Sequence, residues 1–183
     1  TTASYNVAVG KDSLNANTTA SNNTAVGYES LKTNTAAENT AFGYRSLYLN
    51  TTGAENVAFG ERTLEANTTA SNNTGVGRTA LWSNTTGASN TAIGHQAMRT
   101  NTTGASNTAV GKAALYANTT GSGNVAIGFS AGDSLTTSAN NVAIGYEALA
   151  TESAYSENTA IGYRALKTNS GGYYNTAVGY EAL

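Results

Sequence analysis

The chain has 183 residues, of which only 11% are charged, and its formal net charge at pH 7 is −2. So few charges, with no basic stripe among them, argue against a nucleic-acid partner. The chain has no Cys, which excludes disulfides and thiolate metal sites, and its apolar runs are only a few residues long, so no membrane-spanning segment is expected.

A five-residue phrase recurs eleven times: Asn, then Thr or Val, then Ala, a bulky apolar residue and Gly. It first occurs at residues 6–10, and its Asn returns at positions 23, 39, 56, 73, 90, 107, 124, 141, 158 and 175. The step is 17 residues everywhere except between Asn23 and Asn39, where it is 16. A period this short corresponds to one turn of a solenoid. We therefore predict an all-β parallel β-solenoid (β-roll) of about eleven 17-residue rungs, with residues 1–183 as a single repeat domain.

The phrase itself is predicted to be a strand. Its fourth position is always Val, Ile or Phe, as at Val9, Phe42 and Ile93, and its second position is Thr or Val. Side chains alternate along a strand, so these two positions share one face and the Ala between them points the other way. The Ala is replaced once, by Gly75. A column restricted to Ala or Gly indicates close contact with another backbone, and we expect it to line a subunit interface.

A Gly ends every copy of the phrase, which indicates a positive φ or an approach too close for a Cβ atom. Four residues later comes Leu, or Met98 in one copy, and we predict that this column is the core. Gly132 interrupts the column, and the nearby Leu135 is expected to compensate. The rest of each unit is a polar turn. Seventeen residues suit two strands of about five residues and two turns, although the stretch from Gly to Leu is also compatible with one helical turn.

The single short unit has its deletion in a turn. Residues 34–38 lack one residue relative to residues 50–55. We expect this turn to absorb the difference, because a one-residue slip would move every later core side chain to the opposite face. Val26 and Phe42 should therefore lie on the same face.

Outward columns are expected to form ladders between rungs. The position after the Gly is most often Tyr, for which we favour stacking or subunit packing over a carbohydrate-binding strip. The Tyr residues are Tyr28, Tyr44, Tyr146, Tyr163 and Tyr180. The next position alternates in charge along Glu29 and Arg45, and along Glu147, Arg164 and Glu181, which predicts ion pairs between rungs.

Two Asn columns are expected to stack as amide ladders. One is the Asn that opens the phrase. The other consists of Asn17, Asn34, Asn50, Asn67, Asn84, Asn101, Asn118 and Asn169.

Candidates for catalysis or metal binding are few. His95 is the only histidine, and it occupies the Tyr position of its unit without a nucleophile column or carboxylate pair beside it, so we interpret it as a surface substitution. Asp133 is isolated and is expected to be solvated, and the Gly-Gly-x-Gly-x-Asp turn of calcium-binding rolls is missing. We expect no enzymatic activity, no catalytic residue, no cofactor and no metal.

Oligomerisation is expected from the size of a rung. Ordering 17 residues costs conformational entropy that a few apolar side chains and the ladder hydrogen bonds hardly offset. A second buried surface would close the gap. We therefore expect self-association through the Ala face, as a homotrimer.

The repeats resemble those of known fibrous proteins. Asn-Thr-Ala-Val-Gly at residues 107–111 is similar to the head repeat of trimeric autotransporter adhesins, whose heads are trimeric β-rolls with a shorter repeat. The longer form at residues 175–183 resembles repeats of bacteriophage tail fibres and related virion or surface proteins. The resemblance covers the whole chain and concerns the repeat type, not a ligand. It implies an extracellular location, on a virion fibre or a bacterial cell surface.

The expected function is that of a structural and adhesive fibre shaft, from a phage tail fibre or a bacterial surface adhesin, which spaces and multiplies attachment points. Its expected partners are other copies of itself and a host-cell surface or glycan. Because the chain starts and stops inside a repeat, we expect it to be a fragment of a longer fibrous protein.

Two alternatives stay open. The first is a solenoid that binds ice or another crystalline surface: if Asn, Ala and Gly point inward, Thr and Val or Ile form a regular outer face. Phe42 and Phe59 would spoil the flatness of that face. The second is a polysaccharide depolymerase, which would require a clustered carboxylate pair that the sequence lacks.

Overall fold

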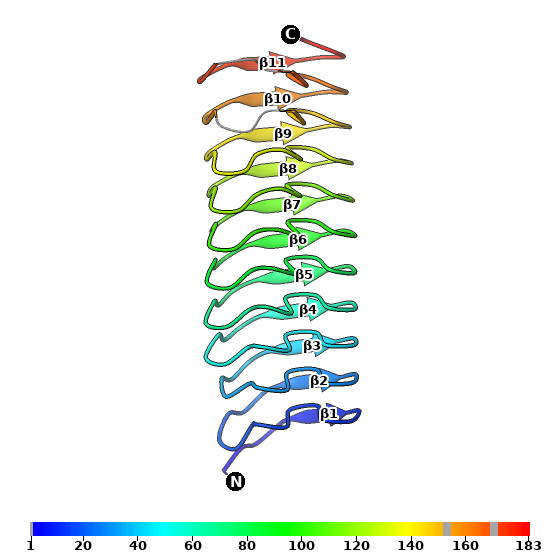
Figure 1. Ribbon diagram of the computed structural model, residues 1–183, viewed down its shortest axis with the longest axis vertical. Coiled ribbons are helices and arrows are strands. Elements are labelled where there is room, and N and C mark those ends of the chain that lie inside the picture. Colours follow the sequence, from blue (N-terminus) through cyan, green and yellow to red (C-terminus); the bar gives the residue numbers. More distant parts are fainter. Residues whose placement is uncertain (1, 152–154, 169–171) are drawn as a thin grey trace.

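The computed structural model describes residues 2–151, 155–168 and 172–183. The chain forms an elongated rod of stacked rungs with its termini at opposite ends (Figure 1). The strands of the described residues are β1 (Val7–Val9), β2 (Thr24–Val26), β3 (Thr40–Phe42), β4 (Val57–Phe59), β5 (Thr74–Val76), β6 (Thr91–Ile93), β7 (Thr108–Val110), β8 (Val125–Ile127), β9 (Val142–Ile144), β10 (Thr159–Ile161) and β11 (Thr176–Val178). They form one parallel sheet in chain order, from β1 to β11. The predicted all-β parallel solenoid is confirmed.

Each strand pairs with the equivalent positions of the next rung. In β6 and β7, Thr91 faces Thr108 and Ile93 faces Val110. The short unit does not disturb this register, since Val26 still pairs with Phe42. The prediction that the turn absorbs the missing residue is confirmed.

The Gly at the end of each strand has both properties that the sequence suggested, a positive φ and a close approach to another backbone. Gly27 has a φ of 133°, and a Cβ atom placed on it would lie 2.4 Å from the carbonyl oxygen of Gly43 in the next rung. The backbones of successive rungs therefore approach too closely at this corner for any other residue.

The prediction of two strands per rung is wrong, and so is the alternative of a helical turn. Each described rung has one three-residue strand, and the opposite wall is made of consecutive turns. These turns contain non-Gly residues with positive φ, such as Glu29 at 55° and Leu31 at 51°, which an extended strand does not allow. The turns are still linked between rungs: the Leu31 N–H donates to the carbonyl of Ser46 at 3.0 Å.

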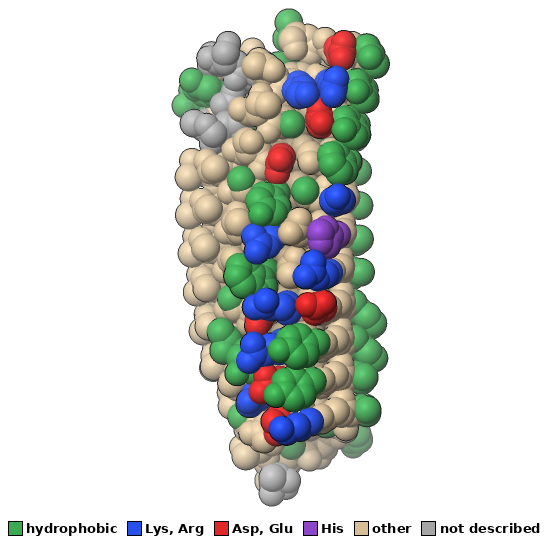
Figure 2. Space-filling model, turned by 45° about the vertical axis from the view of Figure 1, so that its right-hand side comes forward, with side chains coloured by type: hydrophobic (Ala, Val, Ile, Leu, Met, Phe, Trp, Pro, Cys, Tyr) green, Lys and Arg blue, Asp and Glu red, His purple; other side chains and the backbone are tan. Residues whose placement is uncertain are grey.

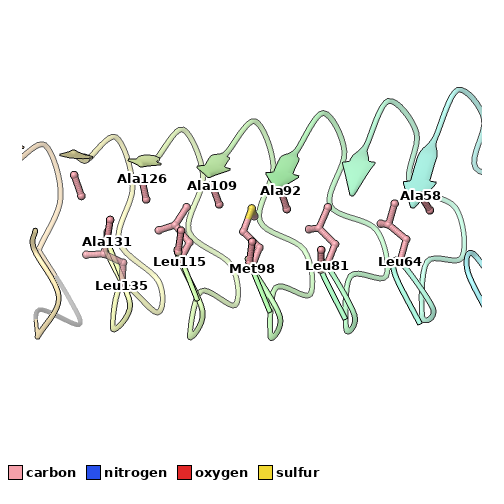
Figure 3. Close-up of a cluster of buried hydrophobic side chains, with 14 of the residues drawn as sticks. Ala58, Leu64, Leu81, Ala92, Met98, Ala109, Leu115, Ala126, Ala131 and Leu135 are labelled. Atoms are coloured by element: carbon pink, nitrogen blue, oxygen red, sulfur yellow. The ribbon is translucent and has the colours of Figure 1, made fainter. Parts of the chain in front are cut away.

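The Leu column is the core, as predicted. Leu64, Leu81 and Met98 are fully buried, and they stack along the interior of the rod (Figure 3).

The Ala column does not line a subunit interface, so that expectation is wrong. Ala58, Ala92 and Ala109 are fully buried within the single chain and point toward the Leu side chains (Figure 3). The two walls of a rung lie so close together that the strand contributes one methyl group and the turns contribute the larger side chain. Close packing leaves no room for a Val on the strand side.

The single departure from Ala supports this explanation. A Cβ atom added to Gly75 would lie 2.6 Å from the Cγ2 methyl of Thr63. Most rungs have the smaller Ser or Ala at the position of Thr63. The additional methyl group of Thr63 thus occupies the space that an Ala side chain fills elsewhere.

Leu135 compensates for Gly132, as predicted. Leu135 is fully buried, and a Cβ atom on Gly132 would lie 3.0 Å from Leu135 Cδ1 and 3.1 Å from Leu115 Cδ2. Leu135 therefore reaches the core from a position that belongs to an Asn column. Its presence there leaves the buried Oδ1 of Asn118 without a hydrogen-bond partner.

Both predicted Asn ladders are present, and Asn169 lies outside the described residues. In the turn column, Asn50 Nδ2 donates to Asn34 Oδ1 at 2.7 Å and to the carbonyl of Gly53 at 2.7 Å. In the column that opens the phrase, the side-chain oxygen accepts from the backbone of the next rung, as Asn23 Oδ1 does from the Asn39 N–H at 2.9 Å. These amides satisfy buried backbone groups at both corners of the rung.

Candidate functional site

The sheet presents an outward face that runs the length of the rod, and we call it the strand face. It consists of the second and fourth positions of the phrase, which flank the buried Ala. The second-position column is Val7, Thr24, Thr40, Val57, Thr74, Thr91, Thr108, Val125, Val142, Thr159 and Thr176. The fourth-position column is Val9, Val26, Phe42, Phe59, Val76, Ile93, Val110, Ile127, Ile144, Ile161 and Val178.

The strand face is free of charge, with an apolar fourth-position column beside a second-position column that is mostly Thr. The side chains of Phe59, Ile93 and Ile127 are 43%, 41% and 40% exposed, and neither column contains a charged residue. Phe42 and Phe59 stack with their ring centroids 4.5 Å apart. A contiguous apolar surface of this extent is typical of an interaction site.

The aromatic side chains after the Gly stack between rungs, as predicted. Ring centroids of successive residues lie 5.1–5.6 Å apart with interplanar angles of 7–12°. The pairs are Tyr28–Tyr44, Phe129–Tyr146, Tyr146–Tyr163 and Tyr163–Tyr180. Within each pair the rings cover one another, and only their edges face outward. A stack of this kind offers few open ring faces to a sugar.

The predicted ion pairs between rungs are present. Arg45 Nε lies 2.8 Å from Glu29 Oε2 of the preceding rung, and Lys32 Nζ of the same rung lies 2.6 Å from Glu29 Oε1. The side chain of Glu29 is only 7% exposed. The hydrogen bonds from Lys32 and then from Arg45 lower the pKa of the Glu29 carboxyl.

A second cluster has the same design. Glu147 Oε2 accepts from Lys167 Nζ at 2.6 Å and from Arg164 Nε at 2.9 Å, and these bonds lower the pKa of Glu147. Arg164 Nη1 lies 3.8 Å from Glu181 Oε1, which continues the alternation of charge. The negative charge of Glu147 is also the main reason why the pKa of Tyr146 is raised.

The column after the Leu is a feature that the sequence analysis did not single out. In five successive rungs it holds Tyr48, Glu65, Trp82, Arg99 and Tyr116. Trp82 Nε1 donates to Glu65 Oε2 at 2.6 Å, and the guanidinium of Arg99 lies 4.8 Å from the Trp82 ring. The 17-residue spacing of these residues was the available signal. Together with the two columns after the Gly, they form a longitudinal band of charged and aromatic side chains (Figure 2).

Two titratable residues, His95 and Asp133, belong to neither cluster of ion pairs. His95 is half-buried in the column after the Gly, between Arg78 and Lys112, where the sequence placed it. Asp133 is half-buried rather than fully solvated, and burial raises the pKa of its carboxyl. Across residues 2–151, 155–168 and 172–183, no three His, Cys, Asp or Glu side chains gather in a group that could hold a metal ion. That part of the chain also has no helix long and apolar enough to cross a membrane.

Comparisons with models of protein families, with curated proteins and with solved structures give no match to this chain.

Proposed function

We propose that the chain is a fibre shaft, whose role is to hold attachment points at fixed spacing on an extracellular fibre. The observation that carries the proposal is the in-register sheet from β1 to β11, whose outward side is an uninterrupted, charge-free strand face. Hydrogen bonds join each rung to the next along the strand, the turns and both Asn ladders. Such a rod is stiff along its axis because bending it would stretch every ladder.

Copies of the same chain are the proposed occupants of the strand face, in a homotrimer. Each copy carries an apolar strip of equal length and identical period, so two strips match rung for rung. The absence of charge from both columns removes the desolvation cost that an ion would impose on such an interface. The likeness of the repeats to those of phage tail fibres and trimeric adhesin heads supports the same arrangement and an origin in a virion fibre or a bacterial surface protein.

The test is the mass of the protein in solution, measured by light scattering after size exclusion. We expect the wild type to be a trimer and the double variant Ile93→Lys/Ile127→Lys to be a monomer with unchanged circular dichroism, because both side chains are already about 40% exposed. A matched control, Thr69→Lys/Thr103→Lys, adds the same charge on exposed turn residues and should stay trimeric. A wild type that is monomeric at every concentration tested refutes the proposal.

Binding to ice or another crystalline surface is the second candidate, and one observation favours it. Asn and Ala point inward, so Thr and Val or Ile form a regular outer array with steps of about 4.7–4.9 Å along the rod and about 6.6–6.8 Å across it. The two Phe side chains that disturb this array lie only in β3 and β4. From β5 to β10 the outer column holds only Val and Ile.

Thermal hysteresis separates this candidate from the first. Hysteresis in a monomeric wild type, lost in Thr108→Tyr, would support binding to ice, because a large ring in the middle of the array breaks its flatness. A wild type without hysteresis eliminates that candidate.

A further inference from the structure

The middle of the rod differs in charge from its ends. Three of the nine Lys and Arg residues, and none of the eleven Asp and Glu residues, lie in residues 66–132. The single His also lies in this stretch. Basic side chains predominate over the middle of the band in Figure 2. The central rungs therefore carry positive charge in a chain that is negative overall.

Arg78, His95 and Lys112 occupy the same position in three successive rungs, and we name them the basic column. Backbone hydrogen bonds keep them in register: the Gln96 N–H donates to the Arg78 carbonyl at 3.1 Å, and the Ala113 N–H donates to the His95 carbonyl at 3.0 Å. Rungs paired in this way are about 4.7–4.9 Å apart, so Arg78 and Lys112 are separated by two such steps with His95 between them. The sequence analysis interpreted His95 singly, as a surface substitution, and did not consider it together with Arg78 and Lys112.

The charges of the basic column have few partners within the chain. Arg78 Nε lies 3.4 Å from Glu61 Oε2, and these side chains are 58% and 47% exposed, so the pair is weak. The ammonium of Lys112 lies 5.6 Å from the ring centroid of Phe129 and forms no ion pair with any described residue. Both cations can therefore bind an external anion.

Arg99 adds a cation in the same rung as His95. Its Nη1 donates to the hydroxyl of Tyr116 at 3.1 Å, and its guanidinium stacks on Trp82, which holds the side chain in place. The Nε of Arg99 is buried and has no hydrogen-bond partner. None of these contacts neutralises the charge of Arg99.

We propose that the basic column and Arg99 bind an acidic polysaccharide, a sugar polymer that bears carboxylate, sulfate or phosphate groups. This inference rests on the proposed function, since it names the chemistry of the surface to which the shaft attaches. Cations repeated at every rung match a polymer that carries anions along its length and lies parallel to the rod.

The contacts favour a sugar polymer over a nucleic acid. Single-stranded nucleic acids bind by stacking their bases on open aromatic rings, but Arg62 and Arg99 lie over the Trp82 ring at 5.3 and 4.8 Å. A DNA duplex is stiff over about 150 bp and would extend along the negative ends of the rod. A flexible glycan can leave the rod beyond the basic zone.

Affinity electrophoresis in gels that contain polygalacturonate, dextran sulfate or neutral dextran tests the proposal. We expect the wild type to be retarded by an acidic polymer and not by dextran, and less so when the ionic strength rises from about 0.01 to 0.15 M. Arg78→Ser/Lys112→Ser should bind about tenfold more weakly, since it removes two exposed ion-pair contacts. The matched control Lys11→Ser/Lys167→Ser loses the same total charge outside the basic zone and should bind like the wild type.

Several results would overturn the inference: no retardation by either acidic polymer, equal retardation by dextran, equal loss in both double variants, or tighter binding to a thymidine oligonucleotide. Circular dichroism melting checks that the variants fold, since Lys11, Arg78 and Lys112 are exposed and Lys167, which pairs with Glu147, is half-buried. The mass measurement keeps the two proposals distinct. A trimer that is not retarded refutes only the glycan site, whereas a retarded monomer refutes only the oligomeric shaft.

Discussion

Replacing Leu135 with Asn tests whether Leu135 fills the core space that a Leu at the position of Gly132 would otherwise fill. In most other rungs an Asn occupies this place, and the core is filled from the position of Gly132. Leu135→Asn would empty a Leu-sized space in the core, which costs about 2–5 kcal/mol. The new amide would complete the ladder by donating to the buried Asn118 Oδ1, which returns about 1 kcal/mol. We expect a net loss of about 1–4 kcal/mol in the free energy of unfolding.

The reciprocal change, Gly132→Leu, should also destabilise the protein when it is made alone. In Gly132→Leu the new Cβ would lie 3.0 Å from Leu135 Cδ1, so the larger side chain meets a filled core and costs about 1–3 kcal/mol or more. The backbone itself is suitable, because Gly132 has a φ of 60° and Leu115 and Leu149 adopt 50° and 51° at the same position. The two changes together restore the pattern of the neighbouring rungs.

Urea unfolding of the wild type, the two single variants and the double variant completes the cycle. We expect the double variant to lie within about 1 kcal/mol of the wild type, which gives a coupling energy of at least about 1 kcal/mol between two residues that share one space. If the effects of the two single changes simply add, the explanation that Leu135 replaces the missing Leu is wrong.

Three further predictions concern the core and the charge clusters. Gly75→Ala should lower the free energy of unfolding by about 1–3 kcal/mol, and adding Thr63→Ser should relieve most of the loss, as measured by urea unfolding. Leu81→Asp should cost more than about 4 kcal/mol, whereas Leu81→Met should cost less than about 1.5 kcal/mol; equal melting temperatures would exclude a core position. The pKa values of Glu29 and Glu147 are lowered in the folded protein, so the stability that these carboxylates contribute is present above pH 4.5 and is lost as the pH falls. The melting temperature of Glu29→Gln/Glu147→Gln should therefore depend less on pH than that of the wild type between about pH 5 and pH 3.

The sequence predicts what the 17-residue period alone determines. Any residue type that recurs at that period must stack on itself, so the Leu core, the Asn ladders and the Tyr stacks follow from position. The structural effect of the deletion at residues 34–38 was also predictable. The turn absorbs it, because only one register keeps Phe42 on the same face as Val26.

The sequence does not reveal how far apart the walls of a rung lie, and both errors arise from this. The Ala column was assigned to an interface because its restriction to Ala or Gly indicated close contact with another backbone. The structure buries Ala92 and exposes Ile93, because Met98 already fills the space between the walls. The second wall was expected to be a strand because 17 residues suit two strands and two turns, whereas Leu81 adopts a φ of 51°, which an extended strand does not allow. Packing against the opposite wall and the hydrogen bond from the Leu81 N–H to the Ala97 carbonyl stabilise that backbone.

The residues that distinguish one rung from another lie on the outside of the rod. Interior positions are nearly invariant among the rungs, since each buried amide and methyl group contacts its own equivalent above and below. Exterior positions are free of that constraint, and they vary in a way that depends on the position along the rod: Phe42 and Phe59 at one end of the strand face, and the basic column in the middle of the band. A ligand that recognises these exterior side chains would therefore bind at a fixed set of rungs. Moving Lys112 to another rung, as in Lys112→Ser/Tyr163→Lys, should preserve the fold and the net charge and weaken binding to polygalacturonate by about threefold, less than the loss in Arg78→Ser/Lys112→Ser.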